Sequence, residues 1–221
     1  MRIITLPGVF APRSDSWLLA ELLAAQTLPP GAAVLDVCTG SGAVAVAAAR
    51  GGAEVTAVDL SRRAVLTARL NARLNGVRIR AVRADLFGAV DGARFDAIVS
   101  NPPYLPGEED ELPGRGAARA WEGGRDGRLL LDRLCAEARA HLRPGGTLLL
   151  VHSSVCGEDE TLARLREVGL EPEVVARRRG PLGPLLAARA EALEARGLLA
   201  PGRREEDVIV FRGRAPLSSS Q

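Results

Sequence analysis

Hydrophobic positions along this chain fall into short apolar runs separated by segments of helical periodicity. The runs are typical of buried strands, and they lie at residues 33–38, 54–59, 77–84, 95–100 and 147–152. The segments between them predict helices at residues 43–50, 61–75 and 129–141, the second of them capped by Ser61. This alternation of strand and helix predicts a parallel sheet that is covered on both faces and has right-handed crossovers.

The ends of the chain complete this pattern. Residues 5–16 lack periodicity and predict an irregular arm, followed by a helix over residues 17–26 with Asp15 or Ser16 as its N-cap. After a turn at residues 144–146, the second half predicts a helix at 158–168, a strand at 173–176, an extra amphipathic helix at 185–199 and a last strand at 207–211.

Together these elements predict an α/β fold, a doubly wound, seven-stranded, mostly parallel sheet whose last strand enters antiparallel. We expect a single domain over residues 1–213, including an N-terminal arm and helix over residues 1–27, and a polar tail over residues 214–221.

The fourth predicted strand stops abruptly at Asn101-Pro102-Pro103-Tyr104. Two consecutive prolines cannot continue a hydrogen-bonded ladder, so the chain must leave the sheet at this point. Asn101 therefore sits at the carboxyl end of a strand, which is where open α/β sheets bind ligands.

This corner suits transfer of a group to a planar nitrogen. If the side-chain oxygen of Asn101 and the carbonyl of Pro102 each accept an N–H bond, the nitrogen lone pair is aimed at an electrophile. Tyr104 would then stack on the flat group, beside Pro103 in the substrate-binding turn. The alternative interpretation is a strand end, a proline stop and a packed tyrosine, without any catalytic role.

A glycine-containing loop follows the first predicted strand, and it places Asp36, Thr39, Gly40 and Gly42 before the first helix of the sheet. Glycines at such a position let the backbone approach a ligand. The loop lacks the third glycine of the dinucleotide fingerprint and the Gly-Lys-Ser/Thr of a P-loop, which disfavours a pyrophosphate. The same corner can hold the amino-acid part of S-adenosylmethionine, with Asp36 near its ammonium group.

Two more aspartates follow predicted strands. We expect Asp59, with Leu60 next to it, to accept both ribose hydroxyls of the cofactor, and Asp85 to accept the adenine amino group with Leu86 beside the ring. Each aspartate alone is more typical of a helix cap or a turn. Their succession at three strand ends favours a cofactor cleft.

With these motifs the chain resembles the class I, Rossmann-like S-adenosylmethionine-dependent methyltransferases, and more narrowly the HemK/PrmC protein-glutamine N5-methyltransferases. The resemblance covers residues from about 10 to 155. Residues 12–16 resemble the Pro-Arg-Pro-Asp/Glu-Thr arm that lies over the cofactor, which implies that Asp15 and Ser16 contact it. Residues 123–127 resemble the Gly-Gly-x-Asp-Gly that follows the catalytic loop of that family.

The resemblance also implies substrates and partners. HemK/PrmC enzymes act on the Gly-Gly-Gln loop of release factors, and the helical N-terminal domain of the bacterial enzymes has no counterpart here. The chain is therefore more similar to the short HemK-related branch, whose members use a small activating subunit. The extra helix predicted at residues 185–199 is unlike the compact core of the family.

The composition of the chain bears on the alternative functions. The net charge is only +2 over 221 residues, and the near-neutral charge argues against an adenine N6-methyltransferase of RNA or DNA, which also carries Asn-Pro-Pro-Tyr. A small-molecule methyltransferase and an inactive cofactor-binding scaffold remain as further alternatives. Three cysteines without Cys-x-x-Cys spacing suggest neither disulfides nor a metal site, and the absence of a signal or membrane-spanning segment predicts a cytoplasmic protein.

Overall fold

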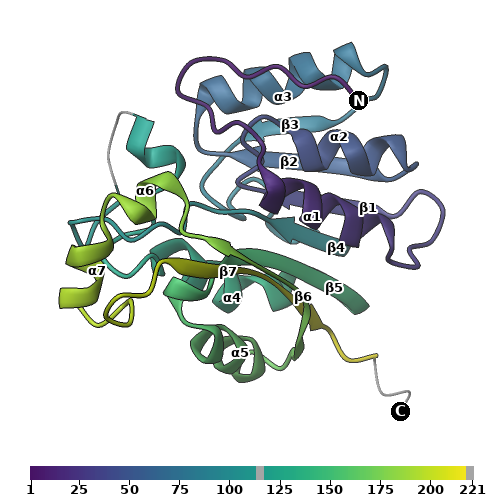
Figure 1. The fold of residues 1–221 in the computed structure, drawn as a ribbon. Helices are drawn as coiled ribbons and strands as arrows, with labels where there is room; N and C mark the ends of the chain where they lie inside the picture. The colour runs from purple at the N-terminus through teal and green to yellow at the C-terminus, as the bar shows by residue number, and fades with distance from the viewer. Residues whose placement is uncertain (113–116, 218–221) are drawn as a thin grey trace.

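The computed structural model describes residues 1–112 and 117–217. Its seven strands form one sheet in the order β3-β2-β1-β4-β5-β7-β6, with helices on both faces (Figure 1). The strands are β1 (Ala33–Val37), β2 (Glu54–Asp59), β3 (Arg80–Arg83), β4 (Phe95–Ser100), β5 (Leu142–Ser153), β6 (Glu171–Pro181) and β7 (Glu205–Arg214). β7 runs antiparallel to both β5 and β6, so the predicted fold and its antiparallel last strand are confirmed.

Four strands differ from their predicted bounds by two residues or more, among them β7, which was predicted at residues 207–211. β3 begins only at Arg80, because the N–H of Val77 bonds back to the end of helix α3 before the chain reaches its partner β2. The predicted turn at residues 144–146 lies inside β5, where the register against β4 shifts and the backbone beyond β7 supplies hydrogen-bond partners. β6 extends to Pro181 because β7 pairs with it along its whole length.

The helices follow the predicted order. They are α1 (Ser14–Ala24), α2 (Ala43–Arg50), α3 (Arg62–Leu74), α4 (Leu129–Ala138), α5 (Glu158–Glu167), α6 (Pro184–Ala187) and α7 (Ala190–Ala195), with short 3-10 turns η1 (Ala117–Ala120), η2 (Arg139–His141) and η3 (Ser154–Cys156). The prediction of Asp15 or Ser16 as N-cap of the first helix is wrong, because both lie within its first turn and Arg13 is the N-cap. Ser61 does cap α3, accepting the N–H of Ala64. The single helix predicted at residues 185–199 is two short helices.

Two apolar layers hold the sheet between the helices. On one face α1, α2 and α3 pack against side chains such as Val34, Val99 and Leu149. On the other face α4 and α5 pack against Leu35 and neighbouring strand residues. Because successive side chains of a strand point to opposite faces, the continuous apolar runs of the sequence supply both layers.

The N-terminal arm is held in place along α3. Asn71 accepts the N–H of Ile4 and donates to its carbonyl, and Asn75 makes the same pair of contacts with Arg2. Figure 1 shows this segment running along α3 before it enters α1. Further along the arm, the carbonyl oxygen of Phe10 lies 3.9 Å from where a Cβ on Gly40, after β1, would be, so the arm passes over the carboxyl ends of the strands. Within the described parts of the chain, no helix is long and apolar enough to cross a membrane.

Candidate active site

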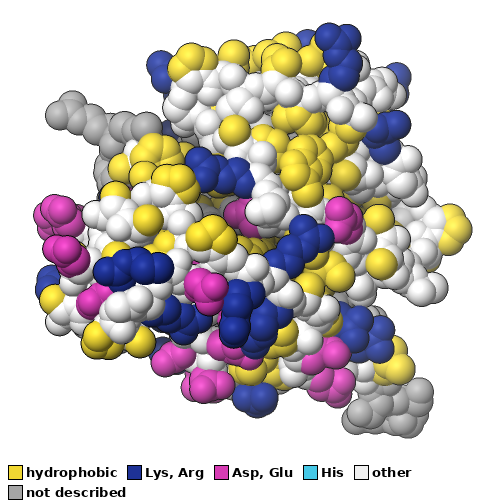
Figure 2. Space-filling view, in the orientation of Figure 1, with side chains coloured by type: hydrophobic (Ala, Val, Ile, Leu, Met, Phe, Trp, Pro, Cys, Tyr) yellow, Lys and Arg dark blue, Asp and Glu magenta, His cyan; other side chains and the backbone are white. Residues whose placement is uncertain are grey.

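A cavity of about 550 Å³ lies at the carboxyl ends of the central strands. All of the residues predicted to form the site line it, with the single exception of Gly42. Figure 2 shows the hollow at the centre of this face, with basic and acidic side chains around it. The residues that the sequence predicted to form the site therefore surround one common space.

Gly42 has a packing role. Its φ is +77°, and a Cβ added to it would lie 2.7 Å from the Cβ of Ala68 on α3. The glycine thus lets α2 start close against α3. Gly40, by contrast, lines the cavity, and the nearest atom to a Cβ added there is 3.9 Å away.

Asp36 closes the first strand from a buried position. One of its oxygens, Oδ2, accepts both the hydroxyl of Thr39 at 2.6 Å and the N–H of Ala45 at 3.1 Å. Burial raises the pKa of the Asp36 carboxyl to about 7, although both hydrogen bonds act in the opposite direction. A cation bound beside it would favour the ionised form, which suits the predicted place of an ammonium group.

Asp59 lies at the end of β2 and orders the loops around it. Its two oxygens accept the N–H of Gly40 at 2.9 Å and the N–H of Ser61 at 2.8 Å. Burial raises the pKa of this carboxyl as well. Each carboxylate oxygen has a second lone pair, so the side chain can still accept hydroxyl groups from the cavity. The carboxylate therefore fits a ribose.

The third predicted aspartate has a different environment. Asp85 is half-exposed and forms an ion pair with Arg133, whose Nη2 lies 2.8 Å from the Oδ2 of Asp85.

Two other residues that line the cavity have a positive φ. Leu86, next to Asp85, is buried and has a φ of +42°, and Cys38, after β1, has a φ of +60°. Backbone conformations of this kind are unfavourable outside glycine and gather at binding sites. Burial raises the pKa of the Cys38 thiol, so it is not a reactive thiolate.

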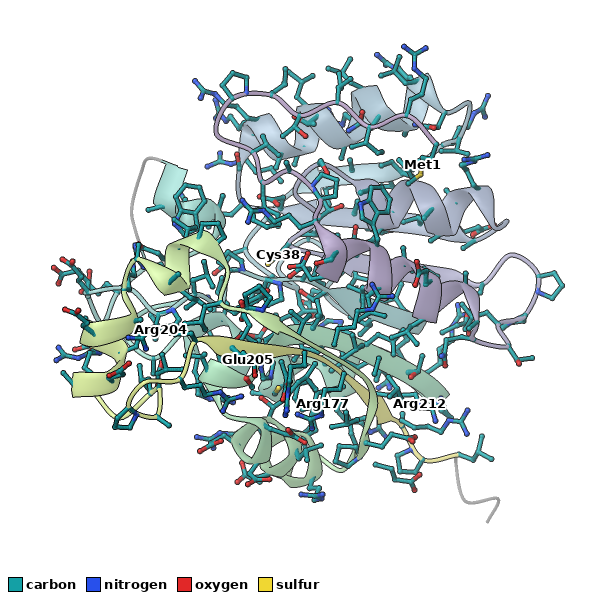
Figure 3. All side chains as sticks on the ribbon, viewed as in Figure 1. Met1, Cys38, Arg177, Arg204, Glu205 and Arg212 are labelled. Atoms are coloured by element: carbon teal, nitrogen blue, oxygen red, sulfur yellow. The ribbon has the colours of Figure 1, made fainter. Side chains whose placement is uncertain are left out.

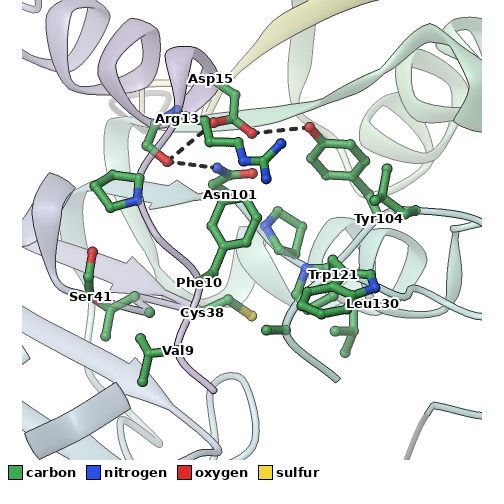
Figure 4. Close-up of a pocket in the computed structure, with 18 of the residues that line it drawn as sticks. Val9, Phe10, Arg13, Asp15, Cys38, Ser41, Asn101, Tyr104, Trp121 and Leu130 are labelled. Atoms are coloured by element: carbon green, nitrogen blue, oxygen red, sulfur yellow. Dashed lines mark hydrogen bonds between the residues drawn. The ribbon is translucent and has the colours of Figure 1, made fainter. Parts of the chain in front are cut away.

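A hydrogen-bonded network joins the first turn of α1 to the acceptor turn at residues 101–104 (Figure 4). The hydroxyl of Tyr104 donates to Oδ2 of Asp15 at 3.1 Å, and the hydroxyl of Ser16 donates to Oδ1 of the same carboxylate at 3.3 Å. Asn101 Nδ2 in turn donates to the Ser16 oxygen at 3.1 Å. Because Ser16 gives its proton to Asp15, its oxygen can only accept, which fixes the amide of Asn101 with its oxygen on the opposite side.

The predicted Gly-Gly-x-Asp-Gly motif packs directly beneath this corner. A Cβ on Gly127 would lie 2.2 Å from the carbonyl oxygen of Tyr104, and one on Gly123 would lie 2.6 Å from that of Pro103. The thiol of Cys156 donates to the same Tyr104 carbonyl at 2.9 Å. Only glycine allows the two backbones to approach this closely, so the motif supports the acceptor turn from below.

Sequence reasoning missed the outer half of the cavity. Trp121, Arg178, Leu185 and Glu206 line it together with Pro184. Trp121 belongs to the long loop at residues 105–127, and nothing in the sequence pattern of this loop singled it out. The other four residues come from β6, α6 and β7, whose approach to the site depends on the sheet order. The part of this loop at residues 113–116 lies outside the described residues.

His152 is a packing residue in the core. It is fully buried, stacks on Phe211 with ring centroids 4.5 Å apart, and hydrogen-bonds Thr161 at 2.8 Å. Burial lowers its pKa to about 4, so the imidazole is neutral near neutral pH.

The arginines at residues 177–179 form ion pairs with Glu158, Asp207 and Glu21 on the surface (Figure 3 labels Arg177).

Comparison with known proteins agrees with this geometry. The family described as "Methyltransferase small domain" matches residues 1–113. A putative protein N5-glutamine methyltransferase of Methanocaldococcus jannaschii is 38% identical over 83% of this chain and 92% of its own length. Release factor glutamine methyltransferases of Mycolicibacterium smegmatis and Bordetella pertussis are each 41% identical, over 73% and 78% of this chain. The matches cover 58% and 66% of the lengths of these two bacterial relatives.

Solved structures share the fold. The E. cuniculi Mtq2-Trm112 complex, described as responsible for methylation of the eRF1 translation termination factor, matches with a TM-score of 0.64, 25% identity and coverage of 94% of this chain and 99% of that one. A T. thermophilus 16S rRNA methyltransferase bound to AdoMet and guanosine matches with a TM-score of 0.61 and 26% identity, over 97% of this chain and 49% of that one. The profile, the relatives and the cavity agree: the chain belongs to the S-adenosylmethionine-dependent N-methyltransferases of the HemK/PrmC type.

Proposed function

We propose that this enzyme transfers a methyl group from S-adenosylmethionine to the side-chain amide nitrogen of a glutamine in a release factor. The observation that carries the proposal is the hydrogen bond from Asn101 to Ser16, which turns the amide oxygen of Asn101 away from α1. The relatives named for release factor glutamine methylation support the choice of substrate.

The acceptor turn provides the contacts that an amide substrate needs. The oxygens of Asn101 and Pro102 accept the two N–H bonds of the glutamine amide, so that its nitrogen lone pair points to the methyl donor. Tyr104, held by Asp15, stacks on the planar amide. These acceptors also stabilise the positive charge that develops on nitrogen as it loses conjugation with its carbonyl.

S-adenosylmethionine supplies a methyl group on a positively charged sulfur, which makes the methyl carbon electrophilic. The acceptor turn at Asn101 and Pro102 would present the amide nitrogen to this carbon, and S-adenosylhomocysteine would be the leaving group. The methylated nitrogen is then strongly acidic and loses one proton to water, so no strong general base is required. Asp36, Asp59 and Asp85 would hold the ammonium, ribose and adenine groups of the donor.

Mass spectrometry tests this proposal directly. A release factor from a related organism is incubated with the enzyme and S-adenosylmethionine, and its Gly-Gly-Gln peptide is analysed. We expect one added methyl group on the glutamine, and none in a release factor that carries glutamate at that position. Labelled methyl groups in total RNA, with an unmodified release factor, would instead indicate the adenine N6 alternative.

We further propose a small activating subunit, on the basis of the similarity to the Mtq2-Trm112 complex. Size-exclusion chromatography of the enzyme co-expressed with candidate small proteins would detect a stable pair, and its specific activity should exceed that of the isolated chain. Equal activity with and without a bound partner would refute activation. Because a translation factor is the proposed substrate, the cytoplasm is the compartment in which we expect the enzyme to act.

A further inference from the structure

The segment between β6 and β7 forms a small lobe of its own beside the active site. Its apolar side chains pack with Val155 of η3 into a cluster separate from the two main layers, and the segment contributes Leu182, Leu186, Ala190, Leu193 and Leu199 to it. α6 and α7 lie within this segment (Figure 1). Leu105, the residue directly after the acceptor turn, packs against the same cluster.

Two arginines of this lobe reach the backbone that leaves the acceptor turn. Arg189 donates to the carbonyl of Pro106 at 2.7 Å and also forms an ion pair with Glu122. Arg196 donates to the carbonyl of Gly107 at 2.9 Å. Both carbonyls lie within three residues of Tyr104. The break between α6 and α7 places Arg189 at their junction.

The same loop returns past the acceptor turn at Trp121 and Glu122, and these residues also bond to its outgoing part and to Arg189. Leu105 donates its N–H to the carbonyl of Trp121 at 2.7 Å, and Glu122, the ion-pair partner of Arg189, is the next residue. The arginine therefore ties together the two backbone segments that flank the cavity. Leu185, from α6 itself, and Trp121 also line the cavity wall.

We propose that the lobe at residues 182–199 is a brace for the acceptor turn, and that Arg189 and Arg196 are positioning residues for methyl transfer. The proposal rests on the proposed function of Asn101 and Tyr104, because the brace acts through the position of that turn. Transfer to a weakly nucleophilic amide requires close alignment of nitrogen and methyl carbon, and small displacements at a reacting centre are costly. The hydrogen bonds of these arginines go to Pro106, Gly107 and Glu122, in the loop after the acceptor turn.

The kinetic test uses Arg189→Ala, Arg196→Ala and the conservative Arg189→Lys. Arg203→Ala is the matched control, because Arg203 lies between the lobe and β7 and its side chain donates to the nearby carbonyl of Glu205 rather than to the loop after the acceptor turn. We expect kcat for the alanine variants to fall on the order of 10- to 100-fold, with the Kd of S-adenosylmethionine unchanged. Arg189→Lys should recover part of the loss, and Arg203→Ala should match the wild type.

A fluorescence test reports on the brace without any substrate. The chain has two tryptophans, so a Trp17→Phe background leaves Trp121 as the only one. We expect Arg189→Ala in that background to shift the emission of Trp121 to longer wavelength, and Arg203→Ala to leave it unchanged. This measurement tests the brace independently of the proposed function, because the emission of Trp121 reports on the loop even if the wild-type enzyme does not methylate a release factor.

Unchanged Trp121 emission in Arg189→Ala would overturn the brace, and so would unchanged kcat in both Arg189→Ala and Arg196→Ala. A loss of cofactor affinity parallel to the loss of kcat would overturn it as well, because it would show a general structural role. If Arg189→Ala fails to fold, Arg196→Ala and Arg189→Lys decide the matter by the same two measurements.

Discussion

The carboxylate of Asp15 connects the first turn of α1 to the residues that we expect to hold the substrate. It accepts hydrogen bonds from Tyr104 and Ser16, and Ser16 accepts one from Asn101. The sequence identified all four residues but assigned Asp15 and Ser16 to the cofactor. The contact of Ser16 with Asn101 joins positions 85 apart in the chain, and that of Asp15 with Tyr104 joins positions 89 apart, so no local pattern reveals either of them.

Replacement of Ser16 tests this network. Ser16→Ala removes the acceptor for Nδ2 of Asn101, so the amide is free to rotate and to present its nitrogen to the substrate. We expect kcat to fall about tenfold, the equivalent of one lost hydrogen bond of roughly 1.4 kcal/mol, with the cofactor Kd unchanged. Ser16→Thr keeps the hydroxyl and should retain most activity. Steady-state kinetics and calorimetry measure the two quantities, and an unaffected kcat in Ser16→Ala would contradict this role.

Asp36 gives the affinity for the cofactor a pH dependence. Its folded-state pKa is raised from 3.8 to about 7, so the free enzyme carries a mostly neutral Asp36 below that value and an anionic one above it. The demethylated cofactor, S-adenosylhomocysteine, carries the same ammonium group, and this group binds better beside an anion. We therefore expect the Kd of S-adenosylhomocysteine to fall as pH rises from about 6 to about 8.

Asp36→Asn is the control for that titration, because an asparagine oxygen can still accept from Thr39 and Ala45. Calorimetry across the pH range should show weaker binding by this variant at about pH 8 and little change of Kd with pH. A wild-type Kd that stays constant over the same range would contradict the placement of the ammonium group beside Asp36.

At the scale of elements, the sequence predicted the order of strands and helices because apolar periodicity reports burial directly. It failed where an element depends on a distant partner. β6 is longer than its apolar run because β7 pairs with its arginine-rich end, and the helix at residues 185–199 breaks where Arg189 turns toward the acceptor loop. Gly42 was interpreted as a ligand-binding glycine, but its lack of a side chain serves the contact with Ala68.

Gly127 provides a test of how the glycine motif supports the acceptor turn. Gly127→Ala introduces a Cβ 2.2 Å from the Tyr104 carbonyl at φ +80°, so both backbone strain and a collision result. We expect a loss of about 3 kcal/mol in the free energy of unfolding, measured in urea, together with a loss of transfer. Gly202→Ala is the matched control.

Gly202 has a φ of +74°, and a Cβ added there meets no atom within 4 Å. Gly202→Ala therefore carries the same kind of backbone strain without the collision, and it should lose only about 1 kcal/mol. Equal losses in the two variants would show that the contact with Tyr104 is unimportant.

In the whole molecule, elements from both halves of the chain meet at one cavity. The inner part is built from loops after β1, β2 and β4, and the outer part from the lobe between β6 and β7. The inner part could be predicted because each strand of a parallel sheet ends at the same edge. The outer part could not, because it depends on β7 entering between β5 and β6.

Binding in the inner part should stabilise the entire domain, since Asp36 and Asp59 belong to central strands of the sheet. At a concentration 100 times the Kd, S-adenosylmethionine should add about 2.7 kcal/mol to the free energy of unfolding and raise Tm by about 5 to 10 °C. Differential scanning fluorimetry measures this shift. A Tm that does not change with cofactor concentration would show that the cavity does not bind it.

The central claim is that Asn101 holds the acceptor amide in line with the methyl group, and single-turnover transfer to a release factor by Asn101→Ala tests it most directly. Asn101 is half-buried at the end of β4, so its truncation should leave the fold and the Kd of S-adenosylmethionine intact. We predict that this variant binds the cofactor normally but loses most methyl transfer, on the order of 100-fold or more. Transfer at the wild-type rate by a cofactor-bound Asn101→Ala enzyme would contradict the account.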